Sequence, residues 1–163
     1  MEIVDGANFL QEIRALILEY AERLGEDLTF QNFAEEMEHL ENKYSGVKNG
    51  KLLAAVAADG SVAGCVAIRC HDSRRCEMKR LYVKPEYRGQ KIGDCLVRTI
   101  LKLAEEAGYE EMVLDTLKRL EGAVHLYRKY GFREIAPYYD NPLDDVIYMK
   151  KDLRDCGKED ILT

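Results

Sequence analysis

The sequence predicts a single mixed α/β domain, in which a mostly antiparallel sheet of about six strands is flanked by about four helices. First, 163 residues with 47% hydrophobic content can bury one substantial core but are too few for two ordinary domains. Second, the apolar spacing predicts the order helix, helix, three strands, helix, strand, helix, two strands. Third, this order of elements does not alternate strand and helix as a doubly wound parallel sheet does, and the sequence contains no internal repeat.

The pattern of apolar residues up to about residue 42 predicts two helices that precede the sheet. Apolar residues recur at helical spacing from Asn8 to Leu24, and Gly25 is the expected C-cap. A second helix is predicted after Thr29, and it continues to about Tyr44. Its apolar face comprises Phe30, Phe33, Ala34, Met37 and Leu40. Its acidic residues are expected on a solvated side, or to attract a cationic substrate, and they are Glu35, Glu36, Glu38 and Glu41.

The segment from about 51 to 153 is expected to form the core of the domain. Two apolar runs, 51–58 and 62–70, are joined by Asp59-Gly60, a strong hairpin signal. A third strand runs from Cys76 to Val83 and stops before Pro85. The elements that follow are a helix over 94–107, a strand over 111–116, a helix over 121–130, and strands over 132–139 and 145–153. Residues 154–163 are expected to form a charged tail.

Composition and charge narrow the classes of partner and location. A net charge of -6 and a pI near 5.2 argue against a nucleic-acid surface or an anionic membrane surface, which need basic faces. The sequence contains no apolar run of membrane-spanning length and no signal-peptide pattern at Met1, so we expect a soluble cytoplasmic protein. The five cysteines include no Cys-x-x-Cys pair. The spacing of Cys70, His71, Asp72 and Cys76 matches no usual metal site, so no metal is expected.

The turn Tyr87-Arg88-Gly89-Gln90-Lys91-Ile92-Gly93 carries the strongest functional signal. Glycines there let the backbone approach a ligand, and amide groups at the start of the next helix would converge on an anion such as a phosphate. The turn lacks the Gly-Lys-Ser/Thr ending of a Walker loop and the three glycines of a dinucleotide fingerprint. An anion-binding turn without either nucleotide signature remains.

Two motifs resemble those of the GNAT superfamily of acetyl-CoA-dependent N-acetyltransferases. Arg88 and Gly93 take the first and last positions of the central family motif, while Lys91 stands where the family usually has glycine. The segment 123–132, with Ala123, Leu126-Tyr127 and Gly131-Phe132, matches the second motif. Leu120 replaces an asparagine that contacts the cofactor in many relatives.

The resemblance implies a sheet that splays beside the strand end at Leu81 to Val83. Acetyl-CoA would enter the splay, pair its pantetheine arm with the backbone of Leu81 and Val83, and place its pyrophosphate on amides between Arg88 and Asp94. The residues expected to bind this co-substrate are Leu81, Tyr82, Val83, Arg88, Gly89, Gln90, Lys91, Ile92, Gly93 and Asp94.

The resemblance also suggests catalytic roles. Tyr127 matches the family position of the general acid that protonates the departing thiolate, although it could instead be a tyrosine packed on a helix face. Glu77 or Asp115 could be the general base, and either could instead be a turn former or ion-pair partner. A backbone N–H of Leu81 or Val83 could polarise the thioester carbonyl.

The acceptor side is less defined by the sequence. Lys79 and Arg80 are expected to point in opposite directions from one strand, so that one reads a substrate carboxylate, or else both are solvated charges. Tyr138, Tyr139 and Asn141 are expected near the acceptor. We therefore expect acetyl transfer to a primary amine of a small molecule, amino acid or peptide, by a protein that could form a homodimer. The alternatives are a non-catalytic CoA-binding or regulatory module and a transferase for a longer acyl group.

Overall fold

A computed structural model describes residues 1–25, 33–40, 44 and 50–154 of the chain. Within this part, seven strands form one sheet in the order β1-β2-β3-β4-β5-β7-β6. The strands are β1 Glu2–Asp5, β2 Lys51–Val56, β3 Val62–Cys70, β4 Arg75–Val83, β5 Glu111–Leu117, β6 Arg133–Ile135 and β7 Val146–Asp152. The helices are α1 Leu10–Leu24, α2 Phe33–Glu38, α3 Ile92–Glu106 and α4 Glu121–Lys129, with short 3-10 turns at Gly6–Phe9 and Pro85–Tyr87. The predicted mixed α/β fold is confirmed.

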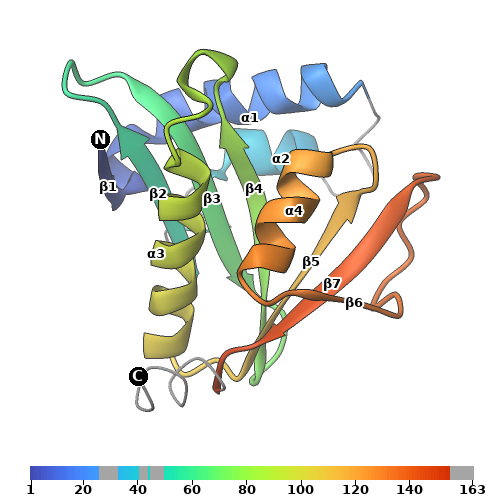
Figure 1. The fold of residues 1–163 in the computed structure, drawn as a ribbon. Helices are drawn as coiled ribbons and strands as arrows, with labels where there is room; N and C mark the ends of the chain where they lie inside the picture. The colour runs from blue at the N-terminus through green and yellow to red at the C-terminus, as the bar shows by residue number, and fades with distance from the viewer. Residues whose placement is uncertain (26–32, 41–43, 45–49, 155–163) are drawn as a thin grey trace.

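The sheet lies between two layers of helices (Figure 1). Helices α3 and α4 cover one face, and α1 and α2 cover the other. Each face has its own apolar cluster. One cluster contains Leu96 and Ile100 of α3 with Met78 and Met112 of the sheet, and the other contains Ile13 of α1 with residues on the opposite face. Among the described residues, no helix combines the length and apolar character needed to span a bilayer.

The structure has one strand more than the prediction of about six. This strand, β1, pairs with β2 in antiparallel register, from Glu2 opposite Val56 to Asp5 opposite Leu53. This strand was not predicted because it has only four residues, of which the two outer ones are exposed. Asp5 then caps the turn that leads into α1 by accepting a hydrogen bond from the Ala7 amide at 2.8 Å.

The two N-terminal helices lie where they were predicted, but two residues of α2 lie on the opposite face of the helix from the one predicted. Gly25 caps α1 in the left-handed conformation with φ 69°, as expected. In α2, Glu36 is buried and Ala34 is exposed, which reverses their predicted sides. The reason for Glu36 is an ion pair with Arg80 of β4. Phe30, Glu41 and the predicted start of this helix lie outside the described residues.

A β-bulge interrupts β4 just before its end. Cys65 pairs with Tyr82 but Ala67 pairs with Lys79, so Val66 alone stands opposite two residues, Arg80 and Leu81. Arg80 takes φ 60° at this point, a left-handed conformation that costs an L-residue about 1–2 kcal/mol. The bulge inverts the side-chain alternation. Met78 and Tyr82, four residues apart, consequently belong to the two different apolar clusters.

The sheet opens between β4 and β5, the one parallel pair in the described sheet. Their register runs only from Arg75 opposite Glu111 to Glu77 opposite Val113. Beyond that point β5 pairs with β7 along its whole length, and β4 pairs with β3. The second halves of β4 and β5 therefore separate, which is the predicted splay.

Candidate active site

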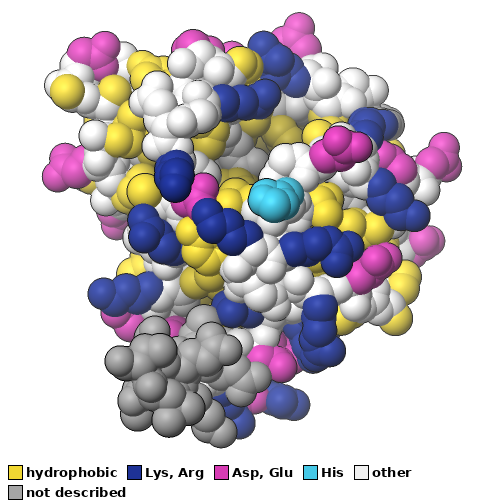
Figure 2. Space-filling view, in the orientation of Figure 1, with side chains coloured by type: hydrophobic (Ala, Val, Ile, Leu, Met, Phe, Trp, Pro, Cys, Tyr) yellow, Lys and Arg dark blue, Asp and Glu magenta, His cyan; other side chains and the backbone are white. Residues whose placement is uncertain are grey.

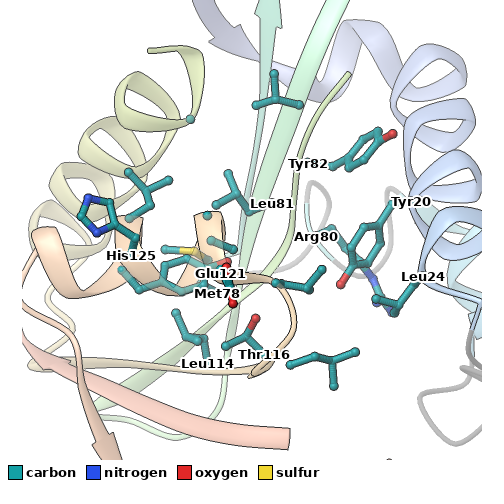
Figure 3. A pocket seen from close by; sticks show the side chains of 18 of the residues that line it. Tyr20, Leu24, Met78, Arg80, Leu81, Tyr82, Leu114, Thr116, Glu121 and His125 are labelled. Carbon is teal, nitrogen blue, oxygen red and sulfur yellow. The ribbon is translucent and has the colours of Figure 1, made fainter. Parts of the chain in front are cut away.

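A cavity of about 960 Å³ occupies the splay. Its floor is formed by β4 from Met78 to Val83 and by β5 from Leu114 to Leu117. The start of α3 and the first turns of α4 line one side, and the end of α1 and the loop before β7 line the other. Figure 3 shows Leu81 and Leu114 near the centre, with His125 of α4 on one side and Tyr20 of α1 on the other. The cavity is thus assembled from both helical layers.

The end of β4 presents a free edge to this cavity. Leu81, Tyr82 and Val83 line it, and none of the three has a β5 partner in the described register. The Tyr82 ring turns towards α1, where its centroid lies 5.7 Å from that of Tyr20 and its hydroxyl donates a hydrogen bond to Glu19. Burial and this carboxylate raise the pKa of Tyr82 to about 12. At Tyr82 a ligand in the splay would therefore meet the backbone of β4 and not the ring.

The glycine turn has the backbone shape that an anion site needs. Gly89 takes φ 83° and Lys91 takes φ 61°, so Lys91 adopts the left-handed conformation usual for the glycine it replaces. A Cβ atom on Gly93 would lie 3.2 Å from Leu126 Cδ2, so this glycine allows α3 and α4 to approach closely. Arg88 reaches back to donate a hydrogen bond to the Val83 carbonyl at 3.2 Å.

Of the ten residues expected to bind the co-substrate, nine line the cavity. Gln90 is exposed and is not part of the lining. Asp94 uses its carboxylate to join α3 to α4, because Oδ1 accepts hydrogen bonds from Lys129 Nζ at 2.5 Å and from the Tyr130 hydroxyl at 3.0 Å. The Lys129 hydrogen bond is the main cause that lowers the pKa of Asp94.

Positive charge lies near the glycine turn, where Arg88 and Lys91 line the cavity although the whole chain is acidic. Figure 2 shows Lys and Arg side chains spread over this face of the molecule.

Tyr127 lies on α4 and lines the cavity from the α3 and α4 side. Its ring packs edge-on against Phe132, with the centroids 5.8 Å apart. No described residue forms a hydrogen bond with its hydroxyl. Burial, together with the nearby Tyr20 and Asp115, raises the pKa of Tyr127, so the phenol stays protonated at neutral pH. It has the proton that a general acid must supply.

Asp115 lies on β5 and faces the same cavity. The two hydrogen bonds that it accepts from described residues both go to Oδ2, from the Tyr139 hydroxyl and from Asn141 Nδ2 at 2.7 Å. Asn141 also lines the cavity, as expected, whereas Tyr138 and Tyr139 are not among its lining residues. This arrangement orients the carboxylate and leaves Oδ1 for a ligand.

Glu77 occupies a different environment, at the closed end of the splay. Its side chain is 1% exposed, and it does not line the cavity. Its Oε1 lies 2.6 Å from Arg69 Nε, and its Oε2 accepts a hydrogen bond from the Tyr138 hydroxyl at 2.6 Å. Burial alone would raise the pKa of Glu77, but Lys79, Arg69 and these hydrogen bonds outweigh it and lower the pKa. Glu77 is held as a buried, ionised partner.

The alternative that Lys79 and Arg80 form a solvated pair is wrong, because they are only 8% and 7% exposed. The expectation that their side chains alternate between the two faces of the sheet does not apply either, because the β-bulge lies at Arg80. Both residues line the cavity. Arg80 is already engaged by Glu36. No group of three or more His, Cys, Asp or Glu side chains in the described parts of the chain is placed to hold a metal ion.

Comparison with known proteins identifies the family. The model of the acetyltransferase (GNAT) family matches residues 11–132, which is more than half of the chain. The chain belongs to the GNAT acetyltransferase family. It is an acyltransferase enzyme, and the resemblance inferred from the two motifs is confirmed.

Relatives of this acetyltransferase span most of its length. An uncharacterized N-acetyltransferase of Schizosaccharomyces pombe is 44% identical over 145 residues, covering 88% of each chain. One of Dictyostelium discoideum is 34% identical over 215 aligned positions, covering 94% of this chain and 99% of the relative. A GNAT-family acetyltransferase structure from Staphylococcus aureus matches with a TM-score of 0.78 at 22% identity, covering 93% of this chain and 98% of the other. An aminoglycoside 6'-N-acetyltransferase structure complexed with coenzyme A matches with a TM-score of 0.70 at 18% identity, covering 94% and 97%. These two likenesses show the fold alone.

Several residues of the acetyltransferase site were not predicted from the sequence. Tyr20, Arg23 and Leu24 of α1 line the cavity, as does Arg119 in the loop before α4. Arg119 Nη2 donates a hydrogen bond to the Leu24 carbonyl at 2.9 Å, which joins the end of α1 to that loop. Tyr20 could not be distinguished from the core stripe of its helix, because a half-buried tyrosine fits helical apolar spacing equally well. Leu120, at the position of the usual asparagine, also lines the cavity.

Proposed function

We propose that this acetyltransferase moves the acetyl group of acetyl-CoA to a primary amine of a small molecule, amino acid or peptide, by direct attack in a ternary complex. The observation that supports the proposal most is a single open cavity with donor features and acceptor features on facing walls. The glycine turn and the free β4 edge lie towards α3, while Asp115 and Tyr20 lie towards β5 and α1, with Tyr127 on α4.

On the donor side, the turn and the first amides of α3 would hold the pyrophosphate, because a helix N-terminus favours an anion. Gly89 and Lys91 supply a backbone shape that permits close approach of the ligand, and Arg88 adds charge. The unpaired edge at Leu81 to Val83 would pair with the pantetheine arm. A backbone N–H on this edge would donate to the thioester carbonyl as negative charge develops there.

On the acceptor side, we assign the base to Asp115 in preference to Glu77. Asp115 faces the cavity with Oδ1 free of hydrogen bonds from described residues, and Tyr139 and Asn141 fix its orientation through Oδ2. Glu77 is buried behind the floor and is engaged by Arg69 and Tyr138. Asp115 would take a proton from the substrate ammonium, directly or through water, so that the neutral amine can attack.

Tyr127 would complete the reaction as general acid. The amine nitrogen bonds to the acyl carbon, the C–S bond breaks, and the Tyr127 hydroxyl gives its proton to the departing thiolate. The second proton that leaves the amine nitrogen, directly or through water, restores the Tyr127 phenol. Because the pKa of Tyr127 is raised, the phenol carries that proton across the physiological pH range. General acid catalysis of this kind typically contributes about 10²–10⁴-fold to a rate.

The proposal is tested by measuring thiol release from acetyl-CoA in the presence of a panel of amines, amino acids and short peptides. Release that depends on both the protein and an amine, with the acetylated amine found by mass spectrometry, is expected. Tight CoA binding without turnover across the panel would support a non-catalytic module instead. Faster turnover with longer acyl-CoA donors would overturn the choice of acetyl group.

A further inference from the structure

A buried ion pair joins α2 to the bulge in β4. Arg80 Nε lies 2.8 Å from Glu36 Oε2, and Arg80 Nη2 lies 3.0 Å from Glu36 Oε1, so the guanidinium and carboxylate meet in a two-point contact. The side chains are 4% and 0% exposed, which makes this the most buried ion pair among the described residues. The pairing raises the pKa of Arg80 despite its burial, which keeps the guanidinium charged.

The surroundings of Arg80 restrict it further. Its guanidinium carbon lies 5.4 Å from the centre of the Phe33 ring, on the same helix as Glu36. The Cys65 thiol lies 3.3 Å from the Arg80 carbonyl and donates to it from β3. Helix α2 thus contacts the Arg80 side chain through both Glu36 and Phe33, and Arg80 is the one residue in β4 whose φ is positive.

This residue also lies in the bulge that precedes the last three residues of the strand, all of which line the cavity. Leu81 and Val83 follow the bulge and pack against the cluster on the α3 side, while Arg80 itself borders the cavity. A buried ion pair is seldom a better source of stability than apolar residues of similar size, because both charges lose their hydration. A strained backbone that persists beside a cavity instead suggests a constraint on function.

We infer that Glu36 and Arg80 are a positioning pair, which holds the bulge so that the β4 edge after it meets the acyl donor in the reactive orientation. This inference rests on the proposed acetyl transfer. Neither side chain is assigned a bond to the reacting atoms. The pair acts through the backbone of Leu81 to Val83, and it links helix α2 to the donor-side strand end.

The test replaces the pair by apolar residues of similar size, Glu36→Leu with Arg80→Met. The matched control is Glu111→Leu with Arg75→Met, because this pair also involves β4, with Nε and Oε1 2.7 Å apart, but lies at the closed end of the splay. Four quantities are measured for each: the melting temperature, the dissociation constant for acetyl-CoA, kcat, and amide hydrogen exchange of residues 79–83.

We expect the Glu36/Arg80 double variant to stay folded and to bind acetyl-CoA within about threefold of wild type, since the phosphate turn is a separate site. Its kcat should fall about tenfold or more, because small misplacement of reacting groups is costly. Exchange at residues 79–83 should quicken. The control should leave kcat and exchange at 79–83 unchanged.

Unchanged kcat in the folded double variant, unchanged exchange at 79–83, or a loss of affinity that matches the loss of rate would each overturn the inference. If the double variant does not fold, Arg80→Lys replaces it, because lysine keeps the charge but not the two-point contact. A wild-type kcat in Arg80→Lys would then overturn the inference. If wild type itself acetylates no amine, the proposed function fails, and the exchange comparison still decides whether the pair holds the bulge.

Discussion

The two sides of the cavity are built in different ways. The donor side is nearly continuous in sequence, since β4, the glycine turn and the start of α3 follow one another from Met78 to Asp94. The acceptor side gathers Tyr20 of α1, Asp115 of β5 and Asn141 of the loop before β7. A side built from one contiguous segment keeps its shape largely through local backbone geometry, to which the Glu36–Arg80 pair adds one distant contact. The other side depends throughout on packing between distant segments. We therefore expect a single substitution on the donor side to reduce activity less than a single substitution on the acceptor side.

The largest effect is expected for Asp115→Asn, which removes the proposed base from the acceptor side. We expect kcat to fall about 10²–10³-fold while the dissociation constant for acetyl-CoA stays near the wild-type value. Steady-state kinetics with a saturating amine, together with calorimetric titration of CoA, measures both. Glu77→Gln is the comparison, and its kcat should fall less than that of Asp115→Asn. The reverse order would assign the base to Glu77.

A smaller loss is expected for Tyr127→Phe, at the junction of the two sides. The change removes only the hydroxyl, so kcat should fall about 10–100-fold with unchanged CoA affinity. The packing against Phe132 is kept, so the melting temperature should hardly change. A variant with wild-type kcat would show that the tyrosine only packs on its helix.

Glu77→Gln should instead affect stability, because it breaks the buried contacts with Arg69 and Tyr138. We expect a loss of about 1–3 kcal/mol in the free energy of unfolding at pH 7. The folded pKa of Glu77 is lowered, so its contribution is complete above the unfolded value of about 4.3 and is lost as the pH falls through the folded pKa. Urea unfolding at several pH values should show wild type and variant converging below about pH 4. A difference that stays constant with pH would contradict this.

The smallest effect is expected on the donor side, for Lys91→Gly. Glycine removes the strain of φ 61°, which should raise stability by up to about 1 kcal/mol. For a chain of this size that corresponds to a melting temperature about 2–4 °C higher. Lys91→Ala is the matched control, because it removes the same charge but keeps the strain. Equal melting temperatures for the two variants would show that the backbone relaxes at this turn.

Much of the donor side could be predicted because its signals are local. The spacing of Arg88 and Gly93, and the apolar periodicity of the strand and helix around them, follow from backbone geometry alone. The positive φ of Lys91 was not evident, since a lysine in place of glycine gives no sign of the conformation it takes. The position of the candidate acid, Tyr127, came instead from the resemblance of its motif to the GNAT family.

The acceptor side, and the bulge within the donor strand β4, could be predicted only in part because they depend on tertiary contacts. Glu36 looked like one of several solvated acids on a helix, and only the fold shows that it meets Arg80. Regular strand alternation could not reveal the bulge at Arg80, which needs one extra residue against β3. Glu77 and Asp115 were equivalent strand carboxylates in the sequence, and the splay alone distinguishes the one that faces the cavity. The short strand β1 was missed because four residues carry too little periodicity.

The central claim is that donor and acceptor share one cavity at the splay. A crystal structure of the protein with CoA bound tests it most directly. The proposal predicts the pyrophosphate at the amides of Gly89 to Asp94, the pantetheine arm along Leu81 to Val83, and the sulfur within hydrogen-bonding distance of the Tyr127 hydroxyl. CoA bound elsewhere, or a sulfur atom far from both Tyr127 and Asp115, would contradict it.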